Sequence, residues 1–368
     1  MSDRGTLPKE MITHILSRLP VESLCRFKCV SPSWKTLISS PYFAKTLLNR
    51  TKTLKNPDNL RKKILIMADN LYSVDLAHTN PTATKLSLPT AEQQLEHQVR
   101  VVNSCDGLVL VSIRCSSELF LLNPSTRECK KLPVFPCVVD SADYFDEDLY
   151  GVGYDSSTDD YKVLIIFSAS FPRTGASIVA IYSLKTDSWR RIQDTDFYLE
   201  AYSGRVFVNG CLHGICWRDG CNGIVAFDLS DEVVREVPQP PWYCGIGSEI
   251  SSYWVAVLGG CLCLVDKRAP EFWKMKEYGV RESWTEFKIR SGLFKAHLLC
   301  LLADDEFLLR TTPGRGLKQW VVYNQQKNTA RNIMVCGIPD QFSFQGTYVE
   351  SLISPHHGGP EEGLGGNE

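Results

Sequence analysis

Apolar and polar residues in the first 50 positions alternate with the spacing of short helices. Pro8 stands near the start of the first helix, and Pro20 ends it. The apolar stripe of this helix is made of Met11, Ile12, Ile15, Leu16 and Leu19. Similar patterns predict a short helix through Leu24, a third from Pro32 and a fourth from Pro41. Such short helices hold too little core to be stable alone, so either a neighbouring domain or a partner protein completes their apolar faces.

From residue 63 onward the patterns predict strands, and one strand pattern occurs six times. Its copies are separated by 48, 61, 45, 48 and 47 residues and start at Leu71, Leu119, Ala180, Val225, Trp273 and Trp320. Several copies follow a hairpin whose turn, such as Asp106-Gly107 or Asn209-Gly210, tolerates positive φ. Units of this length are typical of a kelch-like propeller. The sequence predicts a mainly β protein with six blades behind an all-α N-terminal module, closed by pairing of residues 348–353 with 64–67.

Composition and charge narrow the classes of function. The chain has 40 Lys and Arg against 42 Asp and Glu, a net charge of −2, so it has no overall basic footprint for a nucleic acid. No apolar run approaches the ~20 residues that span a bilayer, and no signal-like region follows Met1. We therefore expect a protein of the cytoplasm or nucleus, not inserted in a membrane, with its 14 cysteines reduced. The basic segment 51–63 is expected to be a solvated linker rather than a nuclear signal or an RNA contact.

Residues that could carry catalysis or bind a metal are sparse. Cys211, His213, Cys216 and Cys221 fit no common zinc spacing, and strand alternation points Cys216 to the face opposite Cys211 and His213. We therefore expect these side chains to lie in the core beside a strand, with His213 hydrogen-bonded. Phosphate-binding glycine motifs, nucleophile elbows and paired carboxylates are lacking. The sequence predicts no active site, no metal and no cofactor, although an enzyme on a propeller scaffold stays open as a less favoured alternative.

The longest gap between strand repeats contains an acidic segment with aromatic residues. Such an insert is usually a solvated loop, but binding residues of propellers lie in loops above the blades. Charge together with aromatic anchors suits a basic protein partner. The candidate substrate-binding residues are Tyr144, Phe145, Asp146, Glu147 and Asp148.

The run from Leu7 to Ile38 begins with Leu-Pro-x-Glu, continues through Arg-Leu-Pro-Val and ends around Trp34. It resembles an F-box nearly position for position, and residues 39–43 match the tail usual in plant F-box proteins. The resemblance implies binding to a Skp-type adaptor and, through it, to the cullin and RING subunits of an SCF ubiquitin ligase. By motif position, the residues that contact the adaptor or pack the helices together are Leu7, Pro8, Ile12, Ile15, Leu16, Leu19, Pro20, Leu24, Val30 and Trp34.

The second half also resembles a family. The carrying motifs are residues 104–108 (Ser-Cys-Asp-Gly-Leu), 123–127, 151–155, 159–163 and 209–213. They are similar to the F-box-associated domain of plant F-box proteins, nearest to the branch that restrains constitutive defence responses by marking immune receptors for destruction. The self-incompatibility F-box proteins share these motifs. One departure is Gly214, which stands where the family often has Trp.

Together the two resemblances imply a non-catalytic subunit that recruits a protein substrate for ubiquitination and proteasomal degradation. The expected domains are an F-box over 1–50, the basic linker over 51–63, the propeller over 64–355 and a disordered tail over 356–368. A propeller that binds its target without ubiquitin transfer is the alternative.

Overall fold

The computed structural model describes residues 8–53, 62–77, 81–88, 99–113, 118–136, 149–167, 178–192, 198–199, 205–218, 221–241, 253–290, 292–293, 296–303, 305–312, 319–339 and 342–356. Four helices come first: α1 (Lys9–Leu16), α2 (Val21–Phe27), α3 (Pro32–Ser39) and α4 (Pro41–Thr53). The Ser31 hydroxyl accepts a hydrogen bond from the Trp34 backbone N–H at 3.2 Å, which caps α3. Ser40 does the same for Phe43 at the start of α4. α4 continues to Thr53, past the boundary expected at residue 50.

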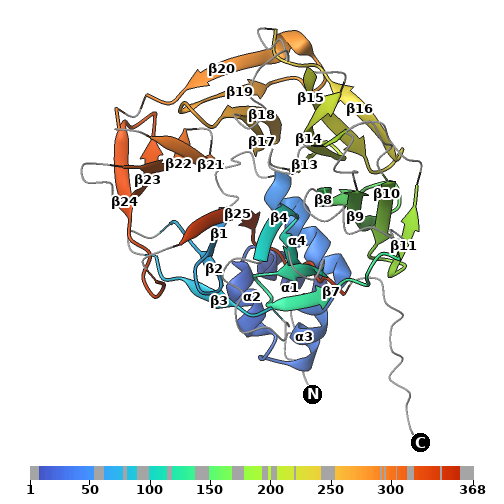
Figure 1. Ribbon diagram of the computed structural model, residues 1–368. Coiled ribbons are helices and arrows are strands. Elements are labelled where there is room, and N and C mark those ends of the chain that lie inside the picture. The colour runs from blue at the N-terminus through green and yellow to red at the C-terminus, as the bar shows by residue number, and fades with distance from the viewer. Residues whose placement is uncertain are drawn as a thin grey trace, which may run out of the picture.

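The described strands form six antiparallel sheets, arranged as the blades of a propeller around a centre (Figure 1). The first blade consists of β25 (Ser343–Val349), β1 (Lys62–Met67), β2 (Leu71–Val74) and β3 (Thr84–Leu86). The second consists of β4 (Val99–Cys105), β5 (Leu108–Ile113), β6 (Glu118–Asn123) and β7 (Glu128–Lys131). The third consists of β8 (Leu149–Asp155), β9 (Asp160–Phe167), β10 (Ile178–Ser183) and β11 (Ser188–Arg191). In each of these blades the first strand named is the innermost and the last is the outermost.

The remaining blades follow the same plan. In the fourth, β12 (Tyr198–Leu199) and β13 (Val206–Val208) both pair with β14 (Cys211–Arg218), followed by β15 (Cys221–Asp228) and β16 (Val233–Val237). The fifth consists of β17 (Tyr253–Leu258), β18 (Cys261–Asp266), β19 (Glu271–Met275) and β20 (Trp284–Lys288), with a short 3-10 helix, η4 (Arg281–Ser283), before β20. The sixth consists of β21 (His297–Ala303), β22 (Glu306–Thr311), β23 (Gln319–Asn324) and β24 (Thr329–Ile333). The prediction of six blades is confirmed.

The C-terminal strand closes the ring, as predicted, but in a different place along the chain. β25 pairs with β1 from Lys62 opposite Val349 to Met67 opposite Ser343, so the strand ends where the predicted run 348–353 begins. Residues 351–353 leave the strand because the Asn123 side-chain amide donates to the carbonyls of Ser351 at 3.1 Å and Ile353 at 2.7 Å. β25 thus supplies the innermost strand of the first blade and joins the two ends of the propeller chain.

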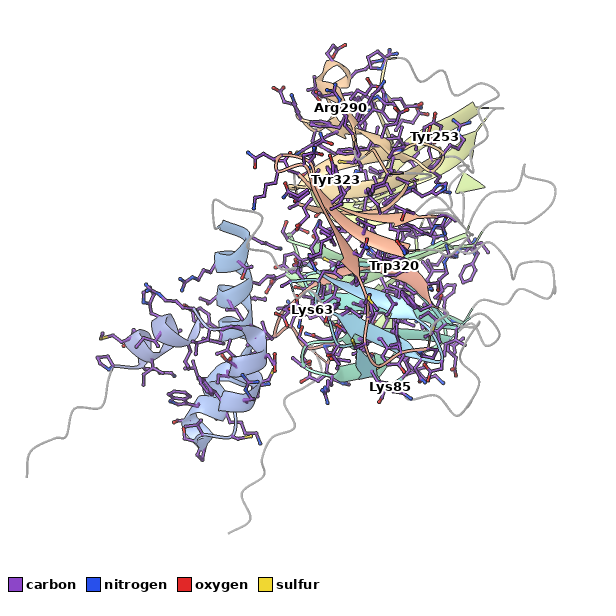
Figure 2. All side chains as sticks on the ribbon, turned by 90° about the vertical axis from the view of Figure 1, so that its left-hand side faces the viewer. Lys63, Lys85, Tyr253, Arg290, Trp320 and Tyr323 are labelled. Atoms are coloured by element: carbon purple, nitrogen blue, oxygen red, sulfur yellow. The ribbon has the colours of Figure 1, made fainter. Side chains whose placement is uncertain are left out.

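The two faces of the propeller differ. Strands within a blade run antiparallel, so the turn after its first strand and the turn after its third strand lie on the same face. The four helices pack on this face, which we call the helix face; Figure 2 shows them beside the propeller seen from its edge. The opposite face, called the far face, receives the ends of the second strands and the starts of the innermost strands.

Buried apolar side chains form clusters between neighbouring blades, and one cluster also contains the helices. Leu24 of α2 and Phe43 of α4 are fully buried in it, together with Leu108 of β5 and Val152 of β8. Burying a side chain such as Phe43 contributes about 1.5–3 kcal/mol. The helical module therefore shares its core with the second and third blades, which completes much of the apolar surface that it could not bury alone.

Candidate adaptor and substrate surfaces

Of the ten residues that the F-box resemblance indicates, the structure describes nine and separates them into two groups. Leu16 and Leu24 are buried, and Ile12, Leu19 and Trp34 are half-buried against the same core. The ring of Trp34 lies 5.7 Å from that of Phe27, centroid to centroid. These side chains pack the helices together. The exposed members, which a partner could reach, are Pro8, Ile15, Pro20 and Val30. Leu7 lies outside the described residues.

Large apolar side chains stand exposed on the helical module. Ile15 on α1 is 49% exposed, and Met11, one helical turn before it, is 52% exposed. Val30, just after α2, is 61% exposed. Sequence analysis placed Met11 in the apolar stripe of the first helix but not among the adaptor residues. Tyr42, at the start of α4, is likewise outside the predicted adaptor residues and is 74% exposed. We call Met11, Ile15 and Val30 the exposed apolar set.

α4 fixes the helical module to the propeller near its centre (Figure 1). Its Leu47 and Leu48 are buried. The Lys52 ammonium lies 2.7 Å from the Asp106 carboxylate, in the turn between β4 and β5. Closer to the start of α4, the Lys45 ammonium donates to Asp159 at 2.6 Å and thereby lowers the pKa of that carboxyl. Apolar burial and two ion pairs together set how the helices sit on the blades.

Two family motifs lie on the helix face, next to the helical module. Asp106 and Gly107 have φ values of 52° and 87°, as a tight hairpin turn requires. A Cβ atom on Gly107 would lie 2.2 Å from the Ser351 hydroxyl oxygen, so glycine is needed for close approach as well. In the second motif, the Asn123 side chain accepts from the Ser125 backbone N–H at 2.8 Å while its amide holds the chain after β25.

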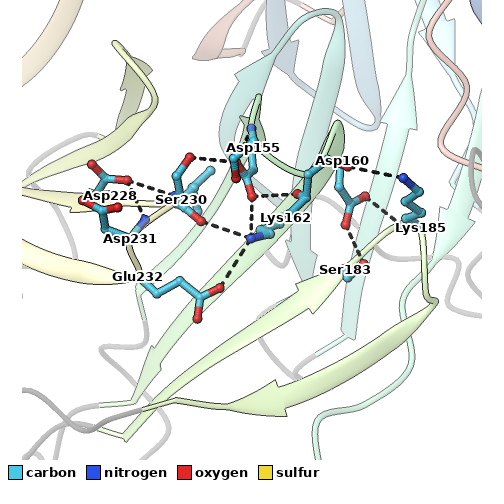
Figure 3. Close-up of polar contacts among 12 residues, drawn as sticks. Asp155, Asp160, Lys162, Ser183, Lys185, Asp228, Ser230, Asp231 and Glu232 are labelled. Atoms are coloured by element: carbon cyan, nitrogen blue, oxygen red, sulfur yellow. Dashed lines mark hydrogen bonds and ion pairs between the residues drawn. The ribbon is translucent and has the colours of Figure 1, made fainter.

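Two further motifs form a buried ion pair that joins the third and fourth blades (Figure 3). The Lys162 ammonium lies 2.7 Å from the Asp155 carboxylate and donates to the Leu229 carbonyl at 3.1 Å. The Asp155 side chain has no exposed surface. Burial alone would raise the pKa of Asp155, but hydrogen bonds from Lys162, Thr158, Ser157 and Ser230 outweigh it and hold this pKa well below its usual range. The pair is a structural connection between blades.

The cysteine and histidine cluster of β14 is strand core, as expected. Cys211 packs in the cluster between the fourth and fifth blades and Cys216 in the one between the third and fourth, so their side chains point to opposite faces of the sheet. His213 is buried, its Nε2 atom lies 2.8 Å from the Tyr278 hydroxyl, and burial lowers its pKa to about 4. No group of three or more His, Cys, Asp or Glu that could hold a metal ion occurs among the described residues. Nor does any described helix have the length and apolarity to cross a membrane.

The acidic candidates for substrate binding, residues 144–148, lie outside the described residues. The strand ends on either side of this segment, at Lys131 of β7 and Leu149 of β8, are at the far face. The described part of the chain also encloses a central cavity of about 740 Å³, which sequence analysis missed because it is lined by residues of several blades.

The described residues thus define a class of protein in which a small helical module packs on one face of a six-bladed propeller. Family comparisons agree with this class. Residues 6–46 match the F-box domain, and residues 62–354 match the F-box associated beta propeller domain. The chain belongs to the plant F-box proteins that carry this propeller, which confirms the prediction from the motifs.

Curated relatives in Arabidopsis thaliana support the family assignment. The F-box protein CPR1 is 32% identical over 315 residues, covering 77% of this chain and 72% of the relative. A second F-box protein is 28% identical over 399 residues, covering 92% of this chain and 89% of the relative. An F-box/kelch-repeat protein is 29% identical over 306 residues, covering 78% of this chain and 80% of the relative.

Proposed function

We propose that this protein is the substrate-recognition subunit of an SCF-type ubiquitin ligase. The observation that carries the proposal is the exposed apolar set on a helical module whose Leu16, Leu24 and Phe43 are buried in the core shared with the propeller. Leaving Met11, Ile15 and Val30 in water is unfavourable unless a partner covers them. A Skp-type adaptor is the partner that the F-box implies, and a cullin and a RING subunit would join through it.

The fixed junction between helices and propeller gives the proposed subunit its mechanism. Helices on one face would hold the adaptor, while the far face would be left for a protein substrate. Because buried Leu47 and Leu48 and the Lys52–Asp106 ion pair attach α4 to the blades, a bound substrate would be presented at a set distance from the ubiquitin-charged enzyme. Such positioning raises effective concentration and needs no catalytic group in this chain. Cytoplasm and nucleus are the compartments where we expect it to act.

Immune receptors are the class of substrate to examine first. The motifs resemble those of the defence-restraining branch, and the curated relatives include CPR1. The self-incompatibility proteins share the motifs, so a substrate from that pathway is the second choice.

The adaptor half of the proposal is tested by binding of the purified chain to a purified Skp-type adaptor, measured by isothermal titration calorimetry. Val30→Asp should weaken binding by at least about tenfold, since it places a charge in the apolar contact. Val134→Asp is the matched control, because Val134 is 71% exposed on the propeller and the same change there should leave the affinity unaltered. No binding by the wild-type chain would leave a stand-alone binding protein as its function.

A further inference from the structure

The central cavity ends at the helix face. Leu48 and Lys52 of α4 line it there. The ammonium of Lys62, at the start of β1, donates to the carbonyl of Leu301 in the sixth blade at 3.0 Å and to that of Val257 in the fifth at 3.5 Å. These contacts lie at the end of the cavity beneath the helices.

The walls of the cavity are mainly apolar. Trp254 of β17 and Phe344 of β25, both half-buried, supply aromatic surface, and Leu299 of β21 adds an aliphatic side chain. The volume of about 740 Å³ lies within the range of roughly 300–1,000 Å³ that is usual for small-molecule sites. A cavity of this shape suits a compact ligand with an apolar body.

The charged side chains that line the cavity are mostly cationic. Among the described lining residues they are Lys52, Lys62, Asp106, Arg205 and Lys267. The single carboxylate, Asp106, is already paired with Lys52. Arg205 directly precedes β13 and Lys267 directly follows β18, so both stand toward the far face, whereas Lys62 stands toward the helix face. Positive charge on low-dielectric walls attracts an anion more strongly than the same charge on an open surface.

We propose that the central cavity binds a small organic anion with an apolar body. The acidic group would lie near Arg205 and Lys267, and the apolar part would contact Trp254, Phe344 and Leu299. This site is separate from the adaptor surface, and the proposal does not depend on ligase assembly.

The test uses 8-anilinonaphthalene-1-sulfonate, a fluorescent aromatic anion, titrated into the full-length protein. We expect saturable binding of one probe per chain. Lys267→Glu should weaken it by about tenfold, because a carboxylate would replace a cation beside the sulfonate. Lys327→Glu is the matched control, since this exposed lysine in the turn before β24 makes the same change in net charge away from the cavity. N-phenyl-1-naphthylamine, which has the aromatic body without the sulfonate, should bind at least about tenfold more weakly than the anion.

Two outcomes would overturn the proposal. Equal binding by Lys267→Glu and Lys327→Glu, or equal binding of the anionic and neutral probes, would show that cavity charge does not select the ligand. Loss of binding in an Ile15→Asp variant would place the probe on the exposed apolar set instead. If circular dichroism shows that Lys267→Glu does not fold, Lys267→Gln provides the same comparison with a smaller expected loss.

Discussion

Replacing Lys162 by methionine should destabilise the propeller more than any change to an exposed charge. The methionine keeps most of the side-chain volume but removes the ammonium that lies 2.7 Å from Asp155. The Asp155 carboxylate, which has no exposed surface, would then be buried without its cation. Removing one partner of a buried ion pair in this way costs about 3–5 kcal/mol.

Chemical denaturation at pH 7, followed by tryptophan fluorescence, measures this cost. The control is Arg26→Met, which breaks an exposed ion pair between Arg26 and Glu22 on α2 and should change the unfolding free energy by less than about 1 kcal/mol. Lys162→Met/Asp155→Asn should recover part of the loss, because the amide keeps an acceptor for Ser230 without a buried charge. A loss in Lys162→Met no larger than in Arg26→Met would refute the reasoning.

The pH dependence of the same variant provides a second check. In the wild type the pKa of Asp155 is lower in the folded than in the unfolded state. Its contribution is therefore complete above the unfolded value of about 3.9 and is lost as the pH falls toward the lower folded value. Without Lys162, burial favours the protonated, neutral form of the Asp155 side chain. The difference in stability between wild type and Lys162→Met should consequently shrink as the pH is lowered from 7 toward 4.

Two further predictions concern the blades. In a thermal denaturation assay, Gly214→Ala should stabilise the protein by about 0.5–1 kcal/mol, because a Cβ atom there meets open space in a strand where glycine is unfavourable. Gly153→Ala should instead destabilise it by about 1–3 kcal/mol, because its Cβ would lie 2.5 Å from the Phe207 ring. His213, with a folded pKa of about 4 against about 6.5 unfolded, contributes stability that is complete above pH 6.5 and falls as the pH drops toward 4. His213→Gln should flatten the stability curve over that interval, and an unchanged slope would contradict the assignment.

Local pattern was enough to predict the architecture. The apolar stripe around Leu16 predicted the first helix, and the regular separation of strand repeats predicted six blades. The first signal depends on residues a few positions apart, and the second on one short pattern that recurs along the chain. The closing strand was displaced from its predicted place because Asn123, distant in sequence, draws residues 351–353 out of the sheet.

The functional surfaces could be predicted only in part. The F-box motif indicated ten residues, but exposure alone distinguishes Ile15 from Leu16, and exposure depends on where the helices rest on the blades. A lysine within the apolar run of β9 is a sequence signal for the role of Lys162. Its partners could not be predicted, because Leu229 and Ser230 approach the ion pair from another blade. The cavity gave no local signal.

The central claim is that one chain binds an adaptor through its helices and a substrate through its propeller. The most direct measurement compares proteins co-purified from plant cells with the wild-type chain and with an Ile15→Asp/Val30→Asp variant, together with the half-lives of those proteins in the same cells. The account predicts that only the wild-type chain retains the adaptor and cullin, and that some proteins bound by both forms are degraded faster with the wild type. Equal half-lives with both forms, or adaptor retained by the variant, would contradict it.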